Sequence, residues 1–252
     1  MAQDDRATAL FFELFSGLPR QGPGSAAGTR RALGHVPGVG PLTRVLDIGC
    51  GTGAQTLVLA HNSPARIVAI DNHPPFIDAL NREAHRLGIT DRLEARVADM
   101  RDLDFADSSF DIIWCEGAIY NVGVEAGLCD WRRLLRINGH VALTEVCWRK
   151  PEPPTECVAF WKREYPAIRD MSALLEAVEA CGYETVAHFP LPASAWWDNY
   201  YRPLQSKVTA FRKRHRDARD AQELADQCQH EIDVWHAYSE FYGYEFLVLR
   251  VR

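Results

Sequence analysis

The order of apolar and polar positions divides much of the chain into short strands and amphipathic helices. Residues 44–48 form a short apolar run that ends at glycines, which is typical of a buried strand. Runs of the same kind recur at intervals along the chain. The expected strands cover residues 44–48, 66–70, 93–97, 110–115, 140–146, 183–189 and 244–251.

The clearest helical pattern lies between the second and third of these strands. Pro74 and Pro75 suit the first turn of a helix, and Gly88 suits its end. The apolar positions between them fall on one face: Phe76, Ile77, Leu80, Ala84 and Leu87. Other helices are expected over residues 7–15, 25–33, 53–61, 124–135, 172–180 and most of 193–237.

Strands that alternate with helices at this spacing predict an α/β fold with a right-handed, doubly wound sheet. In such a sheet a ligand binds at the carboxyl ends of the strands, near the point where the strand order reverses. Pro151–Pro154 is a linker-like break, and the last hundred residues follow the pattern less regularly.

Composition places the chain among ordinary globular proteins, because 47% of its 252 residues are hydrophobic and 25% are charged. The net charge of −6 argues against a general nucleic-acid binder, which needs a basic excess. The basic run 212–216 is accordingly read as a solvated helix face. No apolar run approaches the roughly 18 residues that a membrane helix needs, so no membrane partner is expected.

The first residues and the cysteines both predict a cytoplasmic protein. Residues 1–6 carry acids where a signal peptide has basic residues and an apolar stretch. The seven cysteines form no C-x-x-C pair and are dispersed, which favours reduced thiols and argues against a zinc site. No metal is expected.

The sequence from Asp47 to Gly53 carries the main chemical signal, because three alternating glycines follow a strand and open a helix. Glycine lets the backbone turn tightly and lets a ligand approach without a Cβ atom in the way. Asp71 lies 20 positions after Gly51, at the end of the next strand, and Asp99 follows the third strand. Carboxylates at adjacent strand ends suit the ribose of a nucleoside-bearing cofactor.

The glycine pattern alone does not separate two cofactor classes. Gly49, Gly51 and Ala54 also satisfy the G-x-G-x-x-G/A fingerprint of dinucleotide-binding domains. Two facts favour another cofactor: Asp47 lies inside the motif, where a carboxylate could face an ammonium group, and 43 residues precede the first strand.

The segment 45–53 strongly resembles the first motif of the class I S-adenosylmethionine-dependent methyltransferases. The segments 99–111 and 135–143 resemble the later motifs of this family, although Asp104, Ile137 and Asn138 depart from the usual residues. Asn tolerates the left-handed backbone that a glycine would adopt. Residues 12–25 and 116–121 further resemble a bacterial subgroup that methylates small molecules.

This resemblance implies a Rossmann-like sheet of seven strands, mostly parallel, with the last strand antiparallel. It divides a single domain, 1–252, into an N-terminal helical lid (1–43), a core (44–191 and 244–252) and a helical cap insertion (192–243). The insertion exceeds the hairpin that this fold commonly has there.

The resemblance also implies where the cofactor, S-adenosylmethionine, would bind and where S-adenosylhomocysteine would be left as product. The glycine loop would hold the methionine part, Asp71 the ribose, and Asp99 the adenine, while Arg20 in the preceding loop could bind a carboxylate. The expected cofactor-binding residues are Arg20, Asp47, Gly49, Cys50, Gly51, Thr52, Gly53, Gln55, Thr56, Asp71, Asn72, Asp99, Met100 and Glu116.

Glu116 and Tyr120 follow the fourth strand and are the candidate catalytic residues, beside the position expected for the methyl group. The alternatives are a solvent-facing loop acid for Glu116 and simple packing for Tyr120. Four aromatic residues between 196 and 201 could wall an acceptor pocket, or could anchor the cap to the sheet. The expected acceptor-binding residues are Tyr120, Asn121, Glu145, Trp148, Trp196, Trp197, Tyr200 and Tyr201.

These patterns predict an enzyme that methylates a small molecule by in-line displacement, as a monomer or homodimer. The alternatives are a nicotinamide-dependent oxidoreductase, a non-catalytic protein that binds S-adenosylmethionine, and, less favoured, an RNA or protein methyltransferase. The acceptor atom stays open, because an activated methyl donor requires alignment more than any particular side chain.

Overall fold

The computed structural model describes the backbone of residues 2–252 and the side chains of residues 6–252. The acidic side chains at positions 4 and 5, on which the expectation about the N-terminus depends, lie outside the described side chains.

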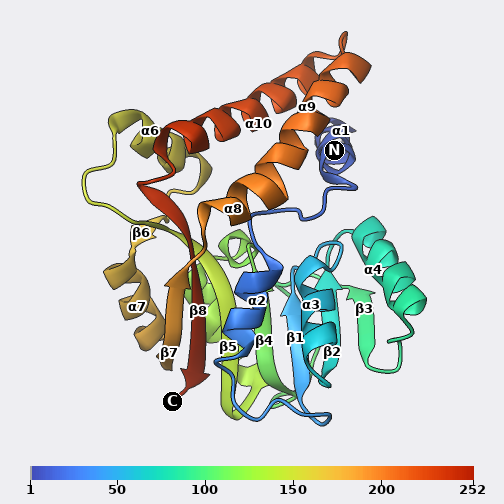
Figure 1. Cartoon of the computed structure of the whole chain (residues 1–252), viewed down its shortest axis with the longest axis vertical. Helices are drawn as coiled ribbons and strands as arrows, with labels where there is room; N and C mark the ends of the chain where they lie inside the picture. The colour runs from blue at the N-terminus through green and yellow to red at the C-terminus, as the bar shows by residue number, and fades with distance from the viewer. Residues whose placement is uncertain (1) are drawn as a thin grey trace.

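One mixed sheet forms the centre of the molecule, with the strand order β3-β2-β1-β4-β5-β8-β7 (Figure 1). Strand β8 runs antiparallel to both β5 and β7, whereas the other pairs along this path are parallel. The Rossmann-like sheet with an antiparallel last strand is therefore confirmed. The bounds are β1 Arg44–Ile48, β2 Arg66–Asp71, β3 Leu93–Val97, β4 Phe110–Glu116, β5 Leu135–Trp148, β7 Tyr183–Pro190 and β8 Tyr242–Val251.

Helices cover both faces of the sheet, which explains why its central strands are apolar on both sides. One face shares a hydrophobic cluster with α2 (Ala26–Leu33), α3 (Ala54–Asn62) and α4 (Pro74–Leu87). The other face packs against α5 (Val124–Trp131) and α7 (Met171–Ala180).

A helical layer stands above the carboxyl edge of the sheet (Figure 1) and is called the cap below. It consists of α1 (Ala2–Phe15), α6 (Thr155–Glu164), α8 (Ala193–Trp196), α9 (Arg202–Arg214) and α10 (Arg219–Tyr238). Helix α1 packs against α9 and α10, so the two ends of the sequence build this layer together. In contrast, α2 packs against α3 and β8, and the expected lid region 1–43 therefore divides between the cap and the sheet.

Several local details differ from the predicted elements. Helix α6 was not expected, because only two of its residues, Cys157 and Phe160, are buried and they mark no long apolar stripe. A two-residue strand, β6 (Arg169–Asp170), pairs with the end of β5 and is too short to leave a pattern. The mainly helical region after residue 193 is broken by a π-helical turn, Trp197–Tyr201.

Strand β5 begins at Leu135, five residues earlier than predicted. Asn138 has a φ of 61°, as expected for a residue in place of glycine, but it lies within the strand. The pairing with β4 is irregular around it and resumes at His140 opposite Ile112. The sequence signal was thus correct for the turn-like backbone and wrong for the start of the strand.

One cysteine pair corrects the expectation of seven reduced thiols. Cys129 at the end of α5 and Cys181 after α7 form a disulfide across 52 residues of sequence. The other five cysteines are free and buried. Chain spacing did not reveal the pair, because only the packing of α5 beside α7 brings the two residues together.

Two further findings concern membranes and metals. Within residues 2–252, no helix combines the length and the apolar character needed to cross a membrane. Among the side chains described, no group of three or more His, Cys, Asp or Glu could hold a metal ion.

Candidate active site

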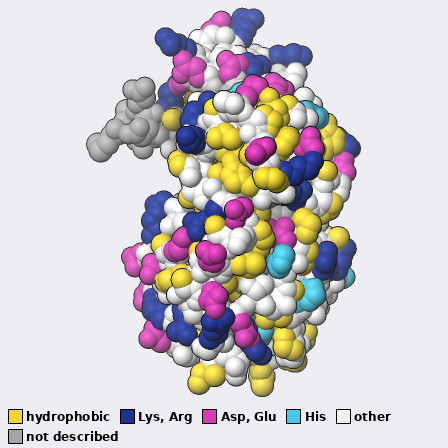
Figure 2. Space-filling view, turned by 90° about the vertical axis from the view of Figure 1, so that its left-hand side faces the viewer, with side chains coloured by type: hydrophobic (Ala, Val, Ile, Leu, Met, Phe, Trp, Pro, Cys, Tyr) yellow, Lys and Arg dark blue, Asp and Glu magenta, His cyan; other side chains and the backbone are white. Residues whose placement is uncertain are grey.

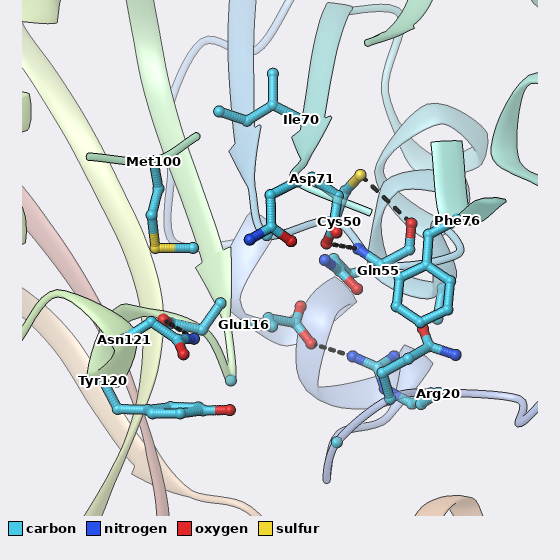
Figure 3. Close-up of a pocket in the computed structure, with 18 of the residues that line it drawn as sticks. Arg20, Cys50, Gln55, Ile70, Asp71, Phe76, Met100, Glu116, Tyr120 and Asn121 are labelled. Carbon is cyan, nitrogen blue, oxygen red and sulfur yellow. Dashed lines mark hydrogen bonds and ion pairs between the residues drawn. The ribbon is translucent and has the colours of Figure 1, made fainter. Parts of the chain in front are cut away.

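A cavity of about 280 Å³ opens at the carboxyl edge of the sheet, between the glycine loop and the end of β4. Figure 3 shows Tyr120 and Asn121 on one side, Phe76 and Arg20 on the other, and Glu116 between them. The sequence-predicted residues in its wall are Arg20, Gly49, Cys50, Gly51, Gln55, Asp71, Asn72, Asp99, Met100, Glu116, Tyr120 and Asn121.

The glycine loop turns between β1 and α3 with a left-handed backbone at Gly49, Gly51 and Gly53. A Cβ atom on Gly49 would lie 2.4 Å from the Cβ of Ala118, in the loop that follows β4. Glycine is therefore required there both for the backbone conformation and for the close approach of two loops that line the cavity. Gly53 lies behind the loop against Leu80 and does not reach the cavity.

Asp47 lies beneath the glycine loop and is fully buried. Its carboxylate accepts hydrogen bonds from the Thr56 hydroxyl at 2.5 Å and the Gln55 amide at 3.3 Å. Burial raises the pKa of Asp47 to about 7, and these two donors oppose that rise. Asp47 and Thr56 are not part of the cavity wall, because their side chains bind each other beneath it, and their contact with the cofactor stays a prediction.

Asp71 links the end of β2 to the glycine loop. One carboxylate oxygen accepts the Gly51 N–H at 2.9 Å, and the other accepts the His73 N–H at 2.9 Å. Asp99, at the end of β3, is exposed in the cavity wall and accepts the Arg101 N–H at 2.9 Å. The strand-end spacing thus correctly predicted two carboxylates at one edge.

Glu116 is buried at the end of β4 and is surrounded by donors. Arg20 pairs with its Oε2 atom at 2.6 Å, while the Thr29 hydroxyl and the Trp114 Nε1–H donate to Oε1 at 2.6 and 2.9 Å. Three donors from three different segments thus fix the position of this carboxyl group. Arg20 was expected to bind a carboxylate, and in the structure that carboxylate is the side chain of Glu116. Glu116 thereby anchors the segment that carries Arg20.

The strap, residues 18–24, crosses the cavity between α1 and α2. The Gln21 carboxamide oxygen accepts the Thr52 N–H at 3.0 Å and the Thr52 hydroxyl at 3.1 Å, so Thr52 faces the strap. Gly24 binds the cap through hydrogen bonds with Ala195 and Asn199. The strap therefore touches the glycine loop, β4 and the cap at once.

An apolar wall from α1 and α4 was not predicted. Phe11, Phe12 and Phe76 line the cavity, and the Phe12 ring stacks on His73 with centroids 3.4 Å apart. The apolar run at the start of the chain was a signal for burial, but it did not show that α1 folds back over the cavity.

The other predicted acceptor residues lie away from this cavity wall. Glu145 is buried on β5, where burial raises its pKa to about 7, and Trp148 is half-buried at the end of the same strand. Trp196, Tyr200 and Tyr201 are buried in the cap.

The aromatic cluster packs among its own members and the neighbouring helices. Trp196 lies against Tyr201 and Tyr244, and Trp197 stacks on Trp235. This placement favours the alternative in which the cluster anchors the cap; direct contact of Trp196, Trp197, Tyr200 and Tyr201 with an acceptor stays a prediction.

The donor and acceptor groups of the cavity fit a nucleoside-bearing cofactor. Carboxylates stand at the ends of β2 and β3, a glycine loop opens beside them, and phenylalanine rings supply an apolar face. The volume is near the lower end of small-molecule pockets, which start at roughly 300 Å³.

Residues 46–143 match the family described as "Methyltransferase domain". This matched part of the chain is therefore similar to methyltransferase domains. The match begins in β1 and ends in β5, so it contains the glycine loop, Asp71, Asp99 and Glu116.

Two curated relatives act on different acceptors. Phosphoethanolamine N-methyltransferase 3 of Arabidopsis thaliana is 29% identical over 179 residues, covering 69% of this chain and 34% of that protein. Geranyl diphosphate 2-C-methyltransferase of Streptomyces lasalocidi is 27% identical over 175 residues, covering 65% of this chain and 58% of that protein. The matches thus span between a third and three fifths of these relatives' lengths.

A solved structure shares the architecture over nearly the full chain. The S-adenosylmethionine-dependent methyltransferase of Geobacter sulfurreducens, crystallised with S-adenosylhomocysteine, superposes with a TM-score of 0.83 at 22% identity, covering 97% of this chain and 98% of that one. At this identity the likeness concerns the fold alone.

Proposed function

We propose that this protein binds S-adenosylmethionine in the cavity and transfers its methyl group to a small-molecule acceptor, releasing S-adenosylhomocysteine. The observation that carries the proposal is the Asp71 carboxylate bound to the Gly51 N–H, beside the exposed Asp99, in a part of the chain that is similar to methyltransferase domains. When bound, the cofactor supplies a methyl group on a sulfonium that already activates it for displacement.

The residues of this chain would then bind and orient the reactants. Asp71 has the position to accept hydrogen bonds from ribose hydroxyls, and Asp99 to accept one from the adenine amino group. Arg20 and Glu116 would hold the strap over the cavity and so exclude water from the reacting atoms. Tyr120, in the wall beyond Glu116, would contact the acceptor.

The sheet topology favours this cofactor over a nicotinamide dinucleotide. Dinucleotide-binding sheets have six parallel strands in the order 3-2-1-4-5-6. Here the antiparallel β8 is inserted between β5 and β7. The two relatives named above act on small molecules, which supports that acceptor class, while their different acceptor atoms leave the atom open.

Isothermal titration with S-adenosylhomocysteine and with NADH tests the cofactor. We expect the protein to bind S-adenosylhomocysteine and not NADH. Asp71→Ala should weaken the binding of S-adenosylhomocysteine at least tenfold, because the variant lacks an acceptor for the ribose hydroxyls and a contact that holds the glycine loop. Asp91→Ala, at an exposed position outside the cavity wall, is the matched control. Binding of NADH without S-adenosylhomocysteine would disprove the assignment.

Catalysis is tested separately with methyl-labelled cofactor and a metabolite extract. Label in a small-molecule product supports the enzyme. Tight cofactor binding with no labelled product would instead favour a non-catalytic binding protein.

A further inference from the structure

The disulfide between Cys129 and Cys181 lies outside the cavity wall, and one of its two residues is at the surface. Cys129, near the end of α5, is exposed, whereas Cys181, directly after α7, is 7% exposed. Figure 2 faces the side of the molecule on which α7 lies in Figure 1. It shows that the cap stands above a waist and leaves the lower half, which holds the sheet, open to solvent. A soluble thiol can therefore approach the bond at Cys129.

The structure also accommodates the reduced form of this pair. The Glu125 carbonyl oxygen lies 3.5 Å from the Cys181 sulfur, so it can accept the S–H of the free thiol. The structure describes all seven cysteines, and the five outside the disulfide are free and buried. Exchange with a thiol in solution is therefore expected at Cys129 and not at the other cysteines.

Helix α5 depends on tertiary contacts, because it is only eight residues long. Isolated helices shorter than about 12–15 residues are marginal in water. The residue before it, Gly123, has no side chain to bind the first N–H groups, and Gly127 within it lowers its intrinsic stability. The position of α5 is therefore set by the contacts that hold it to its neighbours.

Two contacts besides the disulfide join α5 to residues near α7. Tyr183, at the start of β7, donates a buried hydrogen bond to the Leu128 carbonyl at 2.9 Å. Arg169 binds the Glu125 carboxylate at 2.6 and 3.1 Å, but these side chains are 24% and 50% exposed. Ion pairs in contact with water stabilise little. The covalent bond is therefore the firmest constraint near the end of α5.

The start of α5 is joined to the loop 117–121, and most of this loop lines the cavity. The Gly123 N–H donates to the Ile119 carbonyl at 2.9 Å. A Cβ atom on Gly127 would lie 3.0 Å from Cγ1 of Ile119, so the helix packs closely on the loop. The loop residues in the cavity wall are Gly117, Ala118, Tyr120 and Asn121.

The end of α5 reaches the cavity wall at a second place. Trp131, two residues after Cys129, donates its indole N–H to the Met100 carbonyl at 3.3 Å. Met100 lies in the wall beside Asp99. A displacement of α5 would therefore disturb both the loop 117–121 and the backbone at Met100.

We propose that Cys129 and Cys181 form a redox switch that exchanges with small dithiols and controls the order of this part of the cavity wall. In the reducing direction a thiolate of the dithiol attacks the Cys129 sulfur. The S–S bond breaks, and its electron pair leaves on Cys181, which takes up a proton. The second thiolate of the dithiol then displaces Cys129, which is also protonated. The dithiol becomes a disulfide, and the protein gains two electrons and two protons.

The consequence for ligand binding rests on the proposed function, in which the cavity binds S-adenosylhomocysteine. With the bond formed, the loop 117–121 and Met100 are held in place before the ligand arrives. With the bond open, α5 is less firmly held, and binding has to order these residues at a cost in affinity. The oxidised protein should therefore bind the ligand more tightly than the reduced protein.

Isothermal titration with S-adenosylhomocysteine compares the oxidised protein with the protein in millimolar dithiothreitol. We expect the dissociation constant to be about three- to tenfold higher in the reduced protein. The double variant Cys129→Ala, Cys181→Ala should bind as the reduced protein does and should not respond to dithiothreitol. Cys157→Ala, which removes a buried free cysteine of α6, is the matched control and should respond as the wild type does. Equal affinity in the two redox states overturns the proposal.

Thiol counting and amide hydrogen exchange test the switch without any ligand. Alkylation in denaturant should find five thiols before reduction under native conditions and seven after it. Reduction should increase exchange over residues 117–131 and leave it unchanged in α3. A bond that persists in millimolar dithiothreitol, or unchanged exchange over residues 117–131, would show a static crosslink and contradict the inference. If S-adenosylhomocysteine binds in neither redox state, the proposed function fails, and hydrogen exchange alone decides whether the switch exists.

Discussion

Two buried tyrosines of the cap region differ in whether their hydroxyl groups are paired. Tyr201 donates to the Glu231 carboxylate at 2.9 Å, whereas the Tyr242 hydroxyl is buried with no hydrogen-bond partner among the described residues. An unpaired buried hydroxyl loses its hydration without compensation, while a paired one contributes net stability. The sequence marks both residues only as aromatic, so this difference belongs to their surroundings.

Replacing each of these tyrosines by phenylalanine should therefore have opposite effects. Tyr242→Phe is expected to leave the free energy of unfolding unchanged or raise it by up to about 1 kcal/mol. Tyr201→Phe is expected to lower it by about 1–2 kcal/mol, because Glu231 loses its donor. Urea unfolding measures both. A marked loss of stability in Tyr242→Phe would show that its hydroxyl has a partner in solution.

Single residues of the glycine loop were the most predictable part of the site. Gly49, Asp71 and Asp99 lie in the cavity wall because their positions follow from strand ends in a parallel sheet. Arg20 was correctly expected near the cavity, but its partner was not, since Glu116 lies 96 positions away and only folding of the strap joins them.

At the scale of elements, the strap depends on the Arg20–Glu116 pair, whose side chains are 10% and 1% exposed. Arg20→Met would leave Glu116 charged, buried and without its cation. Loss of one partner of a buried pair costs about 3–5 kcal/mol, and the two remaining donors should hold the loss near the lower figure.

A double-mutant cycle checks this expectation. Arg20→Met should be strongly destabilising, and Arg20→Met with Glu116→Gln should recover part of that loss, because a neutral amide needs no cation. Urea unfolding gives the coupling energy. Additive effects of the two substitutions would mean that the pair does not hold the strap in solution.

The basic run at the end of α9 has a structural role between elements. Arg214 and His215 both bind Glu13 of α1, at 2.7 and 3.0 Å, and Arg212 binds Asp226 of α10 at 2.6 Å. The run was read as a solvated face. Arg214 is 67% exposed, but Arg212 and His215 are partly buried, and these side chains join α1 and α10 to the end of α9.

The Cys129–Cys181 disulfide joins α5 to α7 and should stabilise the face of the sheet that they cover. For a loop of 52 residues, the chain-entropy model gives about 4 kcal/mol. Reducing agent should lower the free energy of unfolding by roughly that amount or less. Cys129→Ser should show the same loss and no further response to reductant. A wild-type protein insensitive to reductant would mean that the bond does not form.

At the scale of the whole molecule, buried carboxyl groups set the dependence of stability on pH. Burial raises the pKa values of Glu145 and Glu231 from 4.5 to about 7. Between these pH values the folded protein holds protons that the unfolded chain releases. Their contribution to stability is therefore fully present below pH 4.5 and is lost as the pH rises through about 7.

Thermal unfolding between pH 5 and 7.5 measures this effect. The wild-type melting temperature should fall over this range relative to Glu145→Gln and Glu231→Gln, in which one titrating group is replaced by a permanently neutral amide. Glu176→Gln serves as the exposed control. If the glutamine variants follow the wild-type curve, neither carboxyl group is protonated in the folded protein.

The sequence by itself determined the sheet, the glycine loop and the carboxylates at the ends of β2 and β3. These features depend on local spacing. Strands alternate with helices, and the residues that directly follow each parallel strand lie at the carboxyl edge of the sheet. The irregular start of β5 and the unpredicted α6 show the limit of local patterns, because bulges and short helices with two buried residues leave little periodicity.

Only the tertiary structure decided the contacts that close the cavity and define its far end. Arg20 with Glu116 and Gly117 with Tyr244 join positions that are 96 and 127 residues apart. Such pairs result from how the strap and the cap pack over the carboxyl edge, and burial there changes the chemistry of the carboxyl groups. For that reason the cofactor could be inferred from the sequence, whereas the contacts that hold the strap over its site required the fold.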